Sequence, residues 1–130
     1  MLKCIKNVKK PSNCLEKRSS MKEIRVYLPT VQKDGQPVSD EQARQAHFST
    51  VDLMSHWYGG VTETEGHGVW LDDAGVEHRE KVYILSSYAT PEAEAEYHDR
   101  LVNMAISLKG YLNQECMLVS IKEVESVLFL

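Results

Sequence analysis

From Met21 onward, the apolar residues recur every second residue in some segments, as in strands, and every three to four residues in others, as in helices. The order of these segments limits the folds that the chain can adopt. Residues 22–28 alternate apolar and polar side chains, which is typical of a half-buried strand. Two further strands are expected at residues 61–71 and 77–88, on either side of a turn. A last extended segment, residues 115–130, is expected to form two short strands with a bend near its middle.

Helical spacing fills the two long intervals between these strands. Ser39 is a good N-cap, and Gln42 three residues later completes a capping box for a helix that is expected to end just before Gly59. Thr90 followed by Pro91 marks the start of a second helix with a pronounced apolar stripe. The resulting order, β-α-β-β-α-β, predicts an α+β, ferredoxin-like fold in which two helices cover one face of an antiparallel sheet.

The other face of this sheet has no covering element in the predicted fold. Depending on strand register, it would carry Tyr27, Trp70 or Tyr83. Aromatic patches of this kind seldom stay exposed, so we expect a homo-oligomer, either a dimer or a trimer.

Charge divides the chain into a basic arm and an acidic domain. Residues 1–20 carry six Lys or Arg and one Glu, a net charge of +5, so the total of −4 leaves −9 for residues 21–130. An acidic body argues against nucleic-acid binding by the folded domain, since phosphate binding needs a basic surface. The arm has no regular periodicity, and we interpret it as a non-native start, with a nucleic-acid-binding arm as the functional alternative.

Cysteine content favours a reducing compartment, and hydropathy argues against a membrane segment. The three cysteines, Cys4, Cys14 and Cys116, include no CxxC pair, and Cys116 in its apolar run is interpreted as a small core residue. No apolar run approaches the ~20 residues of a membrane span, so no membrane partner is expected. We therefore expect a cytoplasmic protein, with free thiols at Cys4 and Cys14.

The region around the second and third expected strands holds the strongest candidates for catalytic or ligand-binding residues. If the turn is centred between Asp73 and Ala74, His67 lies opposite Glu80, and Glu65 shares their face. A histidine with two carboxylates can move a proton or hold a divalent metal, although the same pattern fits a solvated hairpin face. Flanking glycines, Gly66 and Gly68, indicate a bulge or a close backbone approach at this point.

Further along the chain, Gln114 and Glu115 open the last extended segment. Polar residues at such a helix-to-strand junction can serve only to satisfy backbone groups, and we take this as the simpler interpretation of Gln114. No metalloprotease motif, nucleophile elbow or phosphate loop is present, and we expect no catalytic residue, metal or cofactor.

A helix that ends in Gly-Gly, followed by Val-Thr, Gly-x-Gly and a hairpin (Gly60, Thr62, Gly66 and Gly68), resembles the PII-like group of ferredoxin-fold regulators. The segment from Gly59 to Trp70, together with Arg79-Glu80 and Gln114-Glu115, also resembles a set of small uncharacterised bacterial ferredoxin-like domains. The resemblance implies trimers that bind nucleotides or small anions between subunits. The chain differs from that group in having a tight hairpin in place of a long mobile loop, and few basic residues.

These features lead to one leading hypothesis and two alternatives. The leading hypothesis is a non-catalytic, oligomeric, ligand-binding or regulatory domain, and its predicted binding residues are Gly66, His67, Gly68, Trp70, Glu80 and Gln114. The first alternative is a small enzyme that uses Glu65, His67 and Glu80 for acid–base or metal-assisted chemistry. The second is an acidic inhibitor or DNA mimic.

Overall fold

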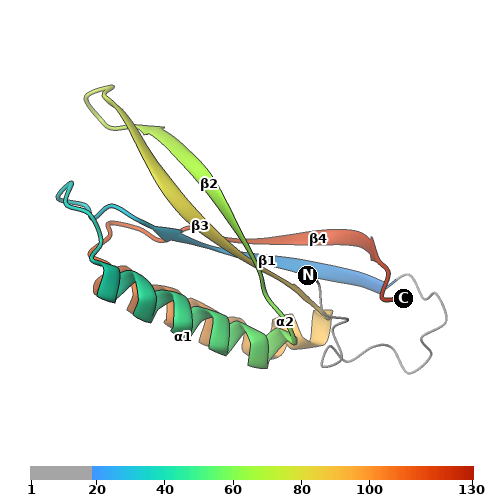
Figure 1. Cartoon of the computed structure of the whole chain (residues 1–130). Coiled ribbons are helices and arrows are strands. Elements are labelled where there is room, and N and C mark those ends of the chain that lie inside the picture. The colour runs from blue at the N-terminus through green and yellow to red at the C-terminus, as the bar shows by residue number, and fades with distance from the viewer. Residues whose placement is uncertain (1–18) are drawn as a thin grey trace.

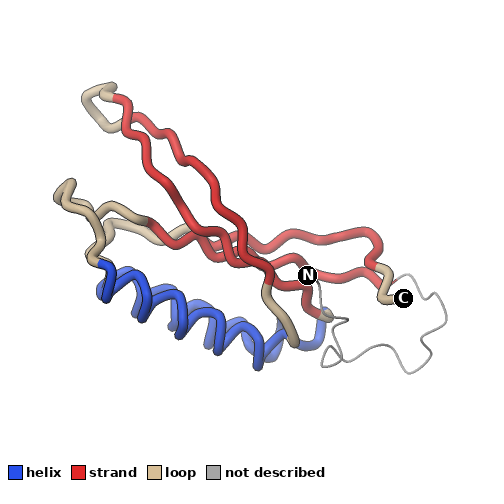
Figure 2. Tube along the Cα trace, viewed as in Figure 1, coloured by secondary structure: helices blue, strands red, loops and turns tan. Residues whose placement is uncertain are grey.

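Four strands form one antiparallel sheet in the order β2-β3-β1-β4 in the computed structural model, which describes residues 19–130 (Figure 1). The elements in chain order are β1 (Ser19–Pro29), α1 (Asp40–Tyr58), β2 (Thr62–Leu71), β3 (Glu77–Ala89), α2 (Pro91–Tyr111) and β4 (Val119–Val127). Both helices lie on the same side of the sheet (Figure 2). The predicted ferredoxin-like order and layering are confirmed.

Helix ends form where the local sequence predicts them. The Ser39 side chain accepts a hydrogen bond from the backbone N–H of Gln42, whose own side chain returns to the cap. Gly59 ends α1 with a φ of 92°, a left-handed conformation that glycine adopts without a steric penalty. Thr90 caps α2 by accepting from the N–H of Ala93.

The hydrophobic core lies between the helices and one face of the sheet. Val26 in β1 pairs with Leu85 in β3, and both are fully buried against the helices. Met54 from α1 and Leu101 from α2 fill the space above them. Because side chains alternate along a strand, these pairs also determine which residues lie on the uncovered face, called here the open face.

The open face carries two of the three predicted aromatic residues. Tyr27 and Trp70 lie on it, whereas Tyr83 pairs with Leu28 and faces the helices. The hairpin formed by β2 and β3 extends beyond the helices and bends away from them (Figure 1). Its tip therefore has no contact with the helical layer.

Three expectations about the strand ends need correction or fall outside the described residues. The last segment forms one strand, β4, rather than two short ones, and its irregularity lies where Ser19 and Met21 pair with it. Cys116 is exposed rather than buried, because it precedes β4 and lies outside the sheet alternation. The predicted basic arm, with Cys4 and Cys14, lies outside the described residues except for its last two, which begin β1.

Candidate functional site

The hairpin turn determines which of the predicted site residues can meet. The Asp72 carboxylate accepts hydrogen bonds from the backbone N–H groups of Ala74 and Val76, each at 2.9 Å. Its other oxygen lies 2.8 Å from Nε2 of His78. Leu71 pairs with Glu77, so the connection contains an odd number of residues and is centred on Ala74. The predicted centre, between Asp73 and Ala74, was wrong by half a residue.

This shift separates His67 from Glu80. His67 pairs with Lys81, and Glu80 pairs with Gly68, so the two side chains lie on opposite faces of the hairpin. The predicted acid–base group of Glu65, His67 and Glu80 is therefore not formed. The predicted bulge is also absent, since pairing is continuous from Thr62 to Leu71.

Glu80 and Gln114 meet at a different point, the backbone of Val31. Oε2 of Glu80 accepts from the Val31 N–H at 3.1 Å, and Nε2 of Gln114 donates to the Val31 carbonyl at 2.8 Å. Partial burial raises the pKa of Glu80, and the backbone N–H groups of Thr30 and Val31 oppose this rise. Both residues thus hold the loop between β1 and α1, as the simpler interpretation of Gln114 predicted.

Gly66 and Gly68 form a flat apolar strip on the open face. A Cβ atom at Gly66 would lie 3.4 Å from Cδ1 of Ile84 and 3.6 Å from a methyl of Val82, which is ordinary contact. Trp70 continues this side of β2 and stacks on His78, with ring centroids 5.4 Å apart. The strip leaves the backbone open to approach by a planar molecule or another chain.

The structure brings together four of the six predicted binding residues on one face: Gly66, Gly68, Trp70 and Glu80. Gln114 joins Glu80 through the Val31 loop. His67 lies on the helix side of the hairpin, opposite Lys81.

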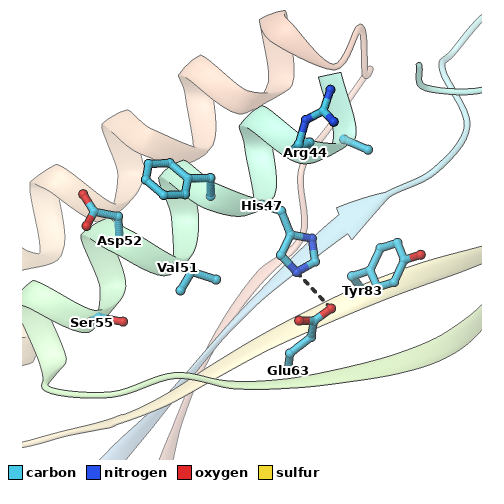
Figure 3. Close-up of a pocket in the computed structure, with 9 residues that line it drawn as sticks. Arg44, His47, Val51, Asp52, Ser55, Glu63 and Tyr83 are labelled. Carbon is cyan, nitrogen blue, oxygen red and sulfur yellow. Dashed lines mark ion pairs between the residues drawn. The ribbon is translucent and has the colours of Figure 1, made fainter. Parts of the chain in front are cut away.

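Sequence reasoning missed a second group of polar residues, in a groove between α1 and the hairpin (Figure 3). Nε2 of His47 lies 2.9 Å from Oε1 of Glu63, and the His47 ring meets the Tyr83 ring edge-on at 5.4 Å. The available signal was weak: His47 is four residues after Ala43 and four before Val51, at the edge of the buried stripe of α1. Its partner on β2 depends on how the helix lies on the sheet.

Within residues 19–130, no group of three or more His, Cys, Asp or Glu side chains is placed to hold a metal ion. Neither helix in this part of the chain is both long and apolar enough to span a bilayer.

No protein-family model matches the chain, and no curated protein matches it in sequence. Solved structures resemble its fold. A phage SAM lyase in complex with S-methyl-5'-thioadenosine is 14% identical, with a TM-score of 0.59 over 84% of this chain and 85% of the other. The periplasmic divalent cation tolerance protein CutA from Archaeoglobus fulgidus is 13% identical, with a TM-score of 0.52 over 83% of this chain and 87% of the other.

CutA from Synechococcus elongatus is similar at 12% identity, with a TM-score of 0.52 over 85% of this chain and 82% of the other. At these identities the likeness concerns the fold. The resemblance to PII-like regulators is thus supported as a small ferredoxin-like architecture.

Proposed function

We propose that this chain is a homo-oligomeric binding domain whose copies cover the open face and hold a small ligand at their junction. The main support for this proposal is the exposed end of the β2–β3 hairpin. This end exposes four large apolar side chains: Trp70 (45%) on the open face, Val69 (53%) and Leu71 (68%) on the helix side, and Val76 (54%) at the turn. Large exposed apolar side chains grouped at one end of a molecule favour an interaction site there.

A second copy is the partner that fits this surface best. Both β2 and β4 are edge strands whose outer backbone groups have no partner strand within the described sheet. Natural proteins seldom leave long edges unprotected, and symmetric self-association is the commonest way to cover a repeated apolar surface. The open face then becomes the inner surface of the assembly.

The proposed ligand lies against the glycine strip. Gly66 and Gly68 let a planar group approach the backbone, and Trp70 offers an aromatic surface. Glu80 uses one carboxylate oxygen for the Val31 N–H, which leaves the other to accept from a ligand.

Among small ligands, we favour a purine nucleoside. The phage enzyme of the same fold was solved with S-methyl-5'-thioadenosine, a molecule of that class. A divalent cation, to which the CutA proteins are related by name, is favoured less, because residues 19–130 bring no metal-binding cluster together.

Assembly is tested first, by sedimentation velocity at micromolar concentration. We expect an oligomer, and we expect Trp70→Ser, which removes the large aromatic side chain of the open face, to dissociate it. Phe48→Ser is the matched control, because Phe48 is equally apolar, is 71% exposed and lies on the helix side. A monomeric parent protein at these concentrations would contradict the proposal.

Ligand binding is tested separately, by calorimetry with S-methyl-5'-thioadenosine. Glu80→Gln keeps an acceptor for the Val31 N–H and removes the charge, so we expect weaker binding with an intact fold. Glu65→Gln, on the other face of β2, is expected to bind like the parent. Binding of Mn²⁺ without any binding of the nucleoside would reverse the choice of ligand.

A further inference from the structure

The groove between α1 and the hairpin lies on the helix side of the sheet, away from the open face. It has a volume of about 660 Å³. The lining residues come from both elements: Ala43, Arg44, His47, Phe48, Val51, Asp52, Ser55, Glu63 and Tyr83. A groove with mainly apolar walls and a few polar groups is the ordinary form of a small-molecule site.

The polar groups of the groove leave it with an excess of negative charge. His47 lies against one oxygen of the Glu63 carboxylate, and the Glu63 side chain remains 45% exposed (Figure 3). Its second oxygen has no partner among the described residues. Arg44, the one Lys or Arg of the lining, is already paired with Glu41, and this pairing lowers the pKa of Glu41.

The apolar groups of the groove keep part of their surface exposed, although Val51 and Tyr83 also pack against the core. Phe48 follows His47 in α1, is 71% exposed and lines the groove. Tyr83 lies across the groove, and its ring forms a T-shaped contact with the His47 ring. An apolar body placed between α1 and β3 would cover both aromatic side chains, while a charged end reached Glu63.

We propose that this groove binds a small organic cation, namely a primary amine attached to an aromatic or branched apolar body. The ammonium group donates to the second oxygen of Glu63, and His47 holds that carboxylate in position. The apolar body packs against Phe48 and Val51. The net charge of −9 on residues 21–130 adds a general attraction for cations.

This site is independent of the proposed function. A second copy that covers the open face leaves the helix side accessible, so either proposal can fail without the other. An anionic ligand fits the groove less well, because Arg44 is neutralised by Glu41 and both remaining charged residues of the lining, Asp52 and Glu63, are acidic.

The test compares two probes with the same body and opposite charge, phenethylamine and 3-phenylpropionate, by NMR titration of backbone amides. We expect phenethylamine to shift amides of His47, Phe48 and Tyr83, and 3-phenylpropionate to leave them unchanged. Glu63→Gln should weaken phenethylamine binding about tenfold, the loss of one charge-assisted hydrogen bond.

Two further variants make the result specific. Phe48→Ser should weaken binding by loss of the apolar contact. Glu65→Gln is the matched control, because Glu65 lies two residues along the same face of β2 and pairs with Lys81 at 3.4 Å. No binding of phenethylamine, equal binding of the anionic probe, or an unchanged affinity in Glu63→Gln would each overturn the proposal.

Discussion

Replacement of Gly66 by alanine separates the stability of one copy from the association of several. The φ angle of Gly66 is not in the left-handed region, so alanine fits the backbone. The added Cβ lies 3.4 Å from Ile84 Cδ1, at ordinary contact distance. Alanine also restricts the unfolded chain, which should stabilise the monomer by roughly 0.5–1 kcal/mol.

Gly66→Ala should weaken the association of the copies, although it stabilises each one. The new methyl group projects from the open face, where the proposed second copy approaches the backbone. We therefore expect Gly66→Ala to raise the urea midpoint of dilute, monomeric protein and to weaken the oligomer. For a domain of this size the gain in monomer stability corresponds to about 2–8 °C in Tm.

The assay is urea unfolding followed by circular dichroism, combined with sedimentation velocity on the same samples. Gly68→Ala is a companion variant, because its Cβ would also find ordinary contacts, 3.7 Å from Val82. A lower urea midpoint in dilute Gly66→Ala protein would refute the contact argument. A stabilised variant with unchanged association would show that the strip is not at the junction.

Three other predictions concern the fold itself. Leu85→Ala removes a fully buried side chain from the central part of the sheet and should cost about 2–5 kcal/mol, measured by urea unfolding. Burial raises the pKa of Glu80 above its ordinary value of 4.5, so the folded state gains stability when Glu80 is protonated, and this gain should be lost as pH rises through the raised pKa. Glu80→Gln should flatten this part of the pH–stability profile. His78 and two backbone N–H groups lower the pKa of Asp72 below 3.8, so the ionised carboxylate stabilises the folded state above pH 3.8, and this stabilisation should be lost as pH falls through the lowered pKa. Asp72→Asn should remove this loss of stability in acid, measured by thermal unfolding across pH.

Local sequence was enough to predict the elements and their order. Ser39, Gly59 and Thr90 act through hydrogen bonds and φ angles within a few residues, so their effects can be read from short segments. Once the order β-α-β-β-α-β was known, few topologies remained. The residues of the glycine strip, Gly66 and Gly68, could also be identified, although the bulge predicted there is absent.

The faces of the hairpin depended on contacts that the linear pattern does not contain. Strand side chains repeat every two residues, so the change from an even to an odd connection moved His67 to the face opposite Glu80. Asp72 selects that connection by binding two N–H groups within the turn. A small difference in the turn thus removed the predicted acid–base group.

Long-range packing decided the remaining contacts. Glu80 and Gln114 meet because both reach the backbone of Val31, which is far from each of them in the chain. The pairing of His47 with Glu63 requires α1 to lie over β2 at one particular position. No local period reports that position, because it follows from how the buried side chains of the helices and the sheet fill their shared core.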